Sequence, residues 1–274
     1  MTKYFKLLAL ISFCTLFSHT QYVHAQTEAV LSNDKQPLEI TADGTLEWHR
    51  NDSLFIATNN ALAKQGDVSL AAAKLIADYN DKDGQNIEIW RVRANENVQI
   101  TSRDTNAYGD KAVYDINKGY AELTGQNLRL TSADQTVTAQ DKFEYWTIEG
   151  KLIATGRARI IRKNERGQVN TLDADTITAY LKNNEKGQRV LDRMEAQGNV
   201  IITTPTETLT GNAGTYVAAT QMAEITGNVK IKRGPNLLEG AKADVNLATN
   251  VSRMFGNGGT RGQVRGIFYP GQKN

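Results

Sequence analysis

The chain has 274 residues, with 32 Lys and Arg against 30 Asp and Glu, three histidines and one cysteine. This near balance of charge gives no electrostatic reason to expect a nucleic-acid partner. A single cysteine excludes an internal disulfide, and three histidines provide little material for a His/Cys metal site.

The first 25 residues predict a secretory signal peptide. Lys3 and Lys6 form a basic start, residues 7–17 are apolar, and small residues precede a cleavage site after Ala25. An apolar run of about 11 residues is too short to span a bilayer, which argues against a membrane anchor. The sequence therefore predicts export from the cytoplasm with a cleaved signal peptide.

Cleavage would change the chemistry that the chain can offer. It removes Cys14, and Phe13 before this cysteine makes a lipoprotein unfavourable; it also removes two histidines and leaves His49. Loss of Lys3 and Lys6 leaves 30 basic against 30 acidic residues, a formally neutral chain. We predict no catalytic group, no metal and no cofactor, although abundant acids leave a polysaccharide enzyme open as an alternative.

The mature chain begins with a polar stretch and then a strand. Residues 26–36 are predicted to be a flexible leader. From Pro37 onward, Leu38 and Ile40 alternate with Glu39 and a threonine, which is the period-2 pattern of a half-buried strand.

A short unit then returns about every 30 residues. Each copy has a glycine or asparagine, or both, interpreted as a turn, followed by an apolar–polar–apolar strand, as in Gly198-Asn199-Val200-Ile201-Ile202. A fixed period indicates supersecondary units that bury their apolar faces by stacking on neighbours. The sequence thus predicts an all-β, elongated, solenoid-like fold built from repeats of ~30 residues. The first apolar positions of the copies are 68, 98, 128, 158, 200 and 229.

The sequence also contains a duplication with a longer period than this repeat. Each unit has a second strand of the Ala-x-Tyr type, and residues 121–125 match residues 223–227 at an offset of 102. We expect two tandem blocks, at about 37–150 and 151–256. Residues 257–274 form a basic, Gly-rich tail, which is either disordered or a docking strand for a partner.

In each apolar–polar–apolar strand, both apolar side chains point to one face, because side chains alternate along a strand. The intervening residues, such as Gln99, Arg129 and Lys230, are expected to face outward. A filled core is the simplest interpretation of such a face. Aromatic residues make up only 7% of the chain, however, which leaves room for acyl chains between small side chains. The predicted inward positions are Val98, Ile100, Leu128, Leu130, Val200, Ile202, Val229 and Ile231.

The repeated unit resembles the OstA-like family of lipopolysaccharide transport proteins. The match rests on Leu/Ile-Thr-Gly-Asn-Val-x-Ile followed by an Asp-x-Ala-x-Tyr strand, and on the first strand Pro-Leu-Glu-Ile-Thr-Ala-Asp at residues 37–43. It extends over about residues 37–255. The resemblance implies a twisted β-jelly roll in the periplasm and no enzymatic activity.

The resemblance also implies partners and a cargo. Family members carry lipopolysaccharide from an LptC-like inner-membrane protein to an LptD-like outer-membrane protein, and they join end to end by edge strands. Acyl chains lie in the apolar interior, and the family's first-strand lipid-facing positions correspond to Leu38 and Ile40. A structural or adhesive β-solenoid with a filled core remains the alternative function. Its edge strands would be capped by the leader and the tail.

Overall fold

The computed structural model describes residues 37–81, 86–103, 105–163, 167–185, 187, 189–249, 251–257 and 262–269. The predicted signal peptide and leader, and half of the predicted basic tail, lie outside these residues. The described residues form 18 strands that pair antiparallel within each of two units, which confirms the expected all-β class. Within these residues there is no helix long and apolar enough to cross a membrane.

The chain divides into two compact units. Of the described residues, the N-terminal unit comprises those of 37–156 and 180–190, and the C-terminal unit comprises those of 157–179 and 191–269. The predicted division into blocks 37–150 and 151–256 stays a prediction.

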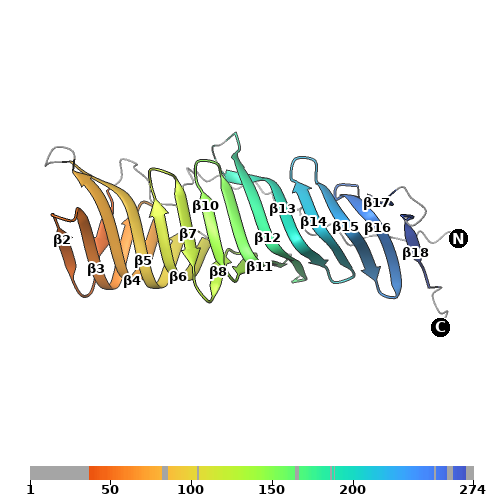
Figure 1. The fold of residues 1–274 in the computed structure, drawn as a ribbon, viewed down its shortest axis with the longest axis horizontal. Coiled ribbons are helices and arrows are strands. Elements are labelled where there is room, and N and C mark those ends of the chain that lie inside the picture. Colours follow the sequence, from red (N-terminus) through yellow and green to blue (C-terminus); the bar gives the residue numbers. More distant parts are fainter. Residues whose placement is uncertain are drawn as a thin grey trace. The chain divides into compact units, whose positions relative to one another are not determined.

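Ten strands belong wholly to the N-terminal unit. Figure 1 shows β2, β3, β4 and β5 side by side. Both β1 and β2 pair with β3, and antiparallel pairing continues through β4, β5, β6, β7 and β10, while β8 pairs with β6 and β9. The strands are β1 (Glu39–Thr41), β2 (Leu46–His49), β3 (Leu54–Gln65), β4 (Val68–Asp81), β5 (Ile87–Ser102), β6 (Thr105–Asp115), β7 (Tyr120–Thr124), β8 (Leu128–Thr131), β9 (Gln135–Ala139) and β10 (Lys142–Trp146).

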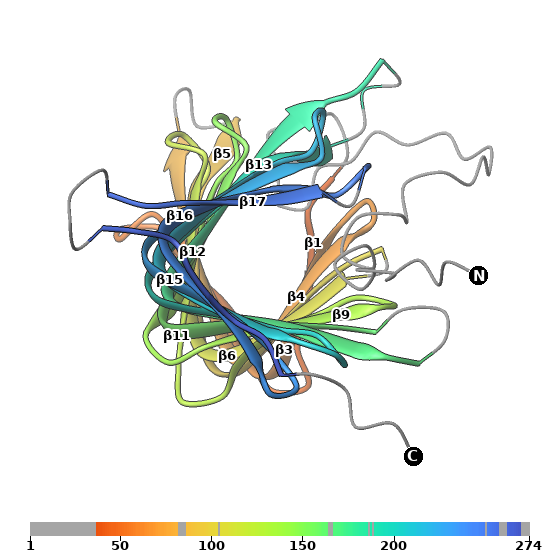
Figure 2. The same ribbon diagram turned by 90° about the vertical axis from the view of Figure 1, so that its right-hand side faces the viewer.

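The other eight strands, β11 to β18, include all the strands of the C-terminal unit. Antiparallel pairing runs through β13, β14, β15 and β16, and both β17 and β18 pair with β16. Figure 2 shows β15 next to β16, with β17 running along β16. The strands are β11 (Lys151–Lys163), β12 (Val169–Asn183), β13 (Arg189–Thr203), β14 (Thr208–Val217), β15 (Met222–Arg233), β16 (Asn236–Asn246), β17 (Val251–Phe255) and β18 (Arg265–Ile267).

The interpretation of the Gly/Asn pairs as turns is wrong for most copies. Gly198 and Asn199 lie inside β13, where both have positive φ (75° and 49°) and the register with β14 shifts between Gln197 and Val200. Gly227 and Asn228 lie inside β15, also have positive φ (79° and 52°), and interrupt the register with β16 between Thr226 and Val229. These pairs are β-bulges, which leave extra residues unpaired and bend the strand. Glycine and asparagine suit these bulges because the two residue types tolerate the left-handed backbone conformation.

A tight turn does occur at Gly66 and Asp67, which join β3 to β4. Register shifts also recur across three consecutive strands of the N-terminal unit, between Thr58 and Ala61 in β3, between Ala71 and Lys74 in β4 and between Asn95 and Val98 in β5. Because neighbours share the irregularity, each strand bends without breaking its ladder on either side of the bulge. The ~30-residue repeat therefore marks the spacing of bulges as well as of turns.

Candidate functional site

The predicted inward residues alternate with exposed ones. Val98, Leu128, Val200 and Val229 are at most 2% exposed, and Ile231 is also buried. The other predicted positions are half-buried: Leu38, Ile40, Ile100, Leu130 and Ile202. Between them, Gln99, Arg129, Ile201 and Lys230 are exposed. The side chains thus face as the alternation requires, while contact with a lipid stays a prediction.

Two of the predicted residues meet at an apolar cavity of about 70 Å³ in the C-terminal unit. Val200 and Ile202 approach it from β13. Val229 and Ile231 belong to an adjoining cluster of buried side chains, against which Ile202 also packs. The cavity is lined by Asn170, Leu172, Met194, Ala196, Val200, Ile202, Thr204, Gly214, Thr215, Tyr216, Ala223, Ile225 and Leu247.

Small residues leave this space open. Gly214 faces Ile225, and a Cβ atom added at Gly214 would lie 2.9 Å from the Ile225 Cδ1 atom and 3.8 Å from the Val200 Cγ1 atom. Ala196 and Ala223 add only a methyl group each to the lining. A volume of about 70 Å³ equals roughly two water molecules in the liquid. A fatty acyl chain would therefore enter only as flexible side chains such as Met194 change rotamer.

The sequence reasoning found only part of this lining. Leu172, Met194 and Ile225 lie outside the repeated Val-x-Ile motif, although each alternates with more exposed neighbours. Tyr216 belongs to a predicted Ala-x-Tyr strand, but nothing in the sequence pattern indicated that it faces the interior. The remaining predicted residues, from Leu38 to Leu130, lie in the N-terminal unit and do not line this cavity.

One wall of the cavity carries a polar side chain. Asn170 on β12 is 3% exposed, and its Oδ1 atom has no hydrogen-bond partner in the described part of the chain. Thr204, also in the lining, accepts a hydrogen bond at its Oγ1 atom from the Glu207 backbone N–H at 3.2 Å. Burial raises the pKa of the Glu207 carboxyl above its ordinary value, against the opposing effect of Arg233.

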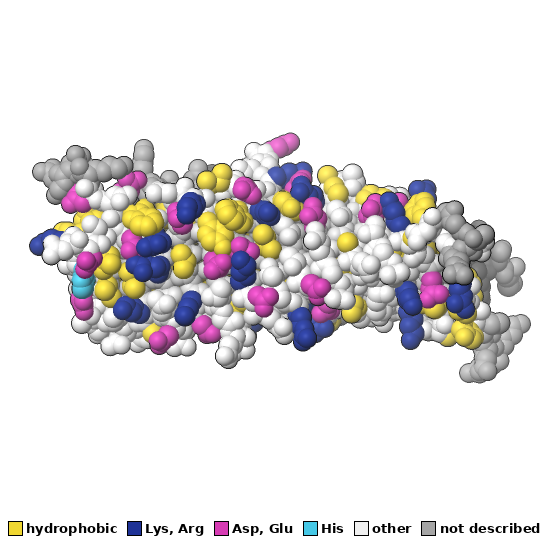
Figure 3. All heavy atoms as spheres, viewed as in Figure 1, with side chains coloured by type: hydrophobic (Ala, Val, Ile, Leu, Met, Phe, Trp, Pro, Cys, Tyr) yellow, Lys and Arg dark blue, Asp and Glu magenta, His cyan; other side chains and the backbone are white. Residues whose placement is uncertain are grey.

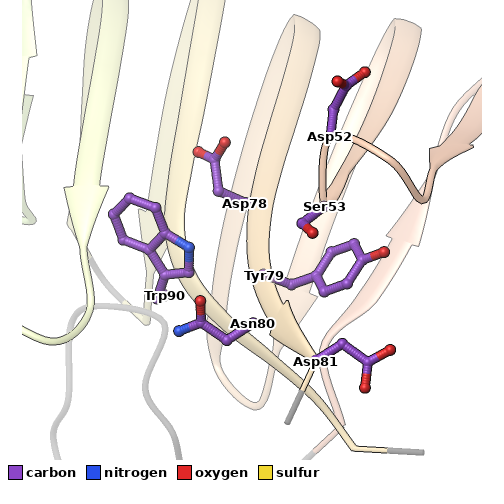
Figure 4. A pocket seen from close by; sticks show the side chains of 7 residues that line it. All are labelled: Asp52, Ser53, Asp78, Tyr79, Asn80, Asp81 and Trp90. Atoms are coloured by element: carbon purple, nitrogen blue, oxygen red, sulfur yellow. The ribbon is translucent and has the colours of Figure 1, made fainter. Parts of the chain in front are cut away.

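A second, polar hollow of about 580 Å³ lies in the N-terminal unit (Figure 4). Asp78 and Tyr79 project to opposite sides of β4, and Trp90 on β5 lies beside them. Asp78 is already held by Arg91 and Arg93, with N···O distances of 2.9 and 2.7 Å. Tyr79 accepts a hydrogen bond from Trp48 at 2.8 Å. These partners give the side chains a structural role, so we place the candidate site in the apolar cavity.

Other polar side chains are also paired. Asp173 and Asp175 lie inside β12; the former contacts Arg159, and the latter accepts hydrogen bonds from Asn199 Nδ2 at 2.9 and 3.1 Å. His49 lies 2.7 Å from the Glu47 carboxylate. The described residues contain no cluster of three or more potential metal ligands. Basic and acidic side chains are interspersed over the face drawn in Figure 3.

Comparison with protein families decides the assignment. The model of the LptA/(LptD N-terminal domain) LPS transport protein matches residues 39–151 and, a second time, residues 141–251. Together the two matches span well over half of the chain. The chain belongs to this family. The expected resemblance to OstA-like lipopolysaccharide transport proteins is thereby confirmed, and the family is one of transport proteins rather than enzymes.

Among solved structures, this LptA/LptD N-terminal family protein matches the crystal structure of LptH from Pseudomonas aeruginosa. LptH is described as the LptA homologous periplasmic component of the conserved lipopolysaccharide transport device. The match covers 88% of this chain and 100% of that chain, at 10% identity and a TM-score of 0.20. At that TM-score the family assignment rests on the family model alone. No curated protein matches the sequence.

Proposed function

We propose that this protein binds lipopolysaccharide in the periplasm and carries it from the inner toward the outer membrane. Its acyl chains would be shielded from water by the apolar interior of the sheet. The family assignment supports the cargo. The observation that supports the shielding is the cavity in which Val200 and Ile202 meet small apolar side chains from neighbouring strands.

Burial alone provides enough free energy for such a role. An acyl chain gains about 0.8 kcal/mol for each CH₂ group removed from water. A lipid with several chains would therefore be held firmly without any charged anchor or chemical step. The predominantly apolar lining favours passive sliding, with the driving force supplied elsewhere in the transport system.

The proposed partners follow from the strands at the two ends of the ladder. β1 and β2 pair with β3, while β17 and β18 pair with β16. Strands at a sheet edge add further strands from other chains. We infer that copies of the protein associate through these edges, and that an LptC-like protein and an LptD-like protein dock at the two ends of the bridge.

A structural β-solenoid with a filled core is the second candidate. The small cavity volume favours it, as does the close packing of Val229 and Ala243, which are both 0% exposed. The two functions differ in one respect that can be measured. A bridge must admit lipid chains between the strands, whereas a filled core admits none.

Photocrosslinking in living cells separates these functions. A photoreactive amino acid is placed at Ile202, which lines the cavity, and in a second variant at Ile201, which is 39% exposed on the opposite face of β13. The two positions share residue type, strand and expression context. We expect a lipopolysaccharide adduct at Ile202 at least several-fold stronger than at Ile201.

Equal adducts at the two positions would indicate nonspecific membrane contact. Absence of an adduct at Ile202 and also at Val98, in a folded and exported protein, would reject the bridge in favour of the filled core.

A further inference from the structure

Asn170 is an amide enclosed among apolar side chains. It is 3% exposed, and it shares the cavity wall with Leu172, two residues further along β12. Its Oδ1 atom has no hydrogen-bond partner among the described residues. A buried carbonyl oxygen without a partner loses its hydrogen bonds to water and gains nothing in return, so it lowers stability.

The neighbouring polar groups do not meet this need. Thr204 uses its Oγ1 atom in the turn before β14, where it accepts hydrogen bonds from Thr206 and Glu207. Thr215 and Tyr216 also line the cavity, but neither donates a hydrogen bond to Asn170 Oδ1. Most of the other lining side chains are apolar, including Leu172, Met194 and Ile225. A water molecule held in the cavity would need two to four polar partners. An acceptor in such a wall instead fits a ligand that is largely apolar and carries one donor.

We propose that Asn170 is a specificity-determining contact for fatty acyl chains that carry a hydroxyl group. This inference rests on the proposed function, since it concerns which chains the interior takes. The chain occupies the apolar lining around Met194 and Val200, and its hydroxyl donates a hydrogen bond to Asn170 Oδ1. A plain hydrocarbon chain occupies the same space but leaves the amide oxygen unpaired.

The discrimination follows from the asymmetry of buried hydrogen bonds. A neutral hydrogen bond contributes little when it only replaces one to water, but an acceptor left unpaired in a closed site is penalised fully. A hydroxylated chain removes that penalty, because its hydroxyl pairs with the amide oxygen, whereas a plain chain leaves the oxygen unpaired. We expect the hydroxylated chain to bind about threefold to tenfold more tightly.

Calorimetric titration of the purified exported protein tests this difference. The probes are dodecanoic acid, 3-hydroxydodecanoic acid and 3-methoxydodecanoic acid, each below the concentration at which it forms micelles. The methoxy compound retains an oxygen but has no donor. Only the hydroxylated acid should bind more tightly than dodecanoic acid. Equal affinity for all three acids, or the same gain for the methoxy acid, would overturn the inference.

Substitution at the site gives a second test. In Asn170→Leu the preference for the hydroxylated acid should disappear while dodecanoic acid binds at least as well as before. Met194→Leu, which alters the same wall without a polar group, should keep the preference. Without ligand, Asn170→Leu should raise the midpoint of thermal unfolding, because the unpaired amide is gone. If Asn170 had a purely structural role, the substitution would instead lower this midpoint. Asn170→Ala repeats the test of ligand preference independently of how well leucine fits.

The outcomes also separate this inference from the proposed function. If all three acids bind equally, the interior takes lipid and only the role of Asn170 fails. If none binds to the folded protein, the lipid-binding function and the inference fail together.

Discussion

Asp78 is the only charged side chain that is buried among the described residues, at 7% exposure. It lies between Arg91 and Arg93 on β5, and the hydrogen bond from Arg91 to Asp78 raises the pKa of that guanidinium. A buried carboxylate is tolerated because two guanidinium groups replace its lost water. The contrasting pair of Asp67 and Arg103, with an N···O distance of 3.1 Å, has a carboxylate that is 69% exposed.

Removal of the two carboxylates should therefore have unequal effects. We expect Asp78→Ala to lower the free energy of unfolding by about 2 kcal/mol, below the range for a fully buried pair because both arginines retain contact with water. Asp67→Ala should lower it by less than about 1 kcal/mol. Urea unfolding followed by tryptophan fluorescence measures both, since Trp48, Trp90 and Trp146 lie in the same unit as these pairs. Equal losses would show that burial does not determine the contribution of Asp78.

At the scale of the element, the bulge is the recurring feature. Gly198 has a φ of 75°, and a Cβ atom there would collide with the Asp175 side chain on β12. Asp175 in turn accepts hydrogen bonds from Asn199, the next residue of the bulge. Glycine is thus required at this bulge by its backbone conformation and by a neighbouring strand.

Gly198→Ala should lower the free energy of unfolding by about 2 kcal/mol or more, which combines left-handed strain with displacement of Asp175. Gly234→Ala is the matched control, because Gly234 also has positive φ (55°) but no atom within 4 Å of an added Cβ. Its loss should be limited to the strain of about 1 kcal/mol. Thermal and urea unfolding report the difference, and equal losses would exclude a role for the contact with Asp175.

The sequence predicted the strands better than their irregularities. Alternation placed Val200 and Ile202 on one face and Ile201 on the other, because that alternation is a property of any strand. It could not distinguish a bulge from a turn at Gly198 and Asn199, since both require left-handed backbone at the same residue types. It also missed Asn170, because a single asparagine in a polar chain has no pattern, and its burial depends on strands distant in sequence.

At the scale of the whole molecule, the association of copies proposed above depends on the exposed edge strand β17. β17 is a short strand that pairs with β16, and Val251 on it is 46% exposed. Val169 on β12 is similarly exposed, at 41%, but β12 has hydrogen-bonded neighbours on both sides. The same substitution at these two positions therefore distinguishes an edge from the interior of the sheet.

We expect the protein to associate with increasing concentration, as measured by sedimentation velocity. Val251→Lys should weaken this association at least several-fold, because an edge lysine opposes the addition of another strand. Val169→Lys should leave it unchanged. A protein that stays monomeric at all concentrations, or that responds equally to both lysines, would argue against assembly through β17.

The bulges have a mechanical consequence for the C-terminal unit. The register shifts in β13, β14 and β15 occur at neighbouring positions, between Gln197 and Val200, Thr210 and Ala213, and Thr226 and Val229. Backbone pairing is interrupted along this line and regular on both sides of it. This line forms a crease, and we expect the sheet to flex along it while the ladders on either side stay intact. Val200 lies immediately beyond the crease and lines the cavity. Bending of the sheet along the crease would therefore widen the narrow interior enough to accept a larger cargo.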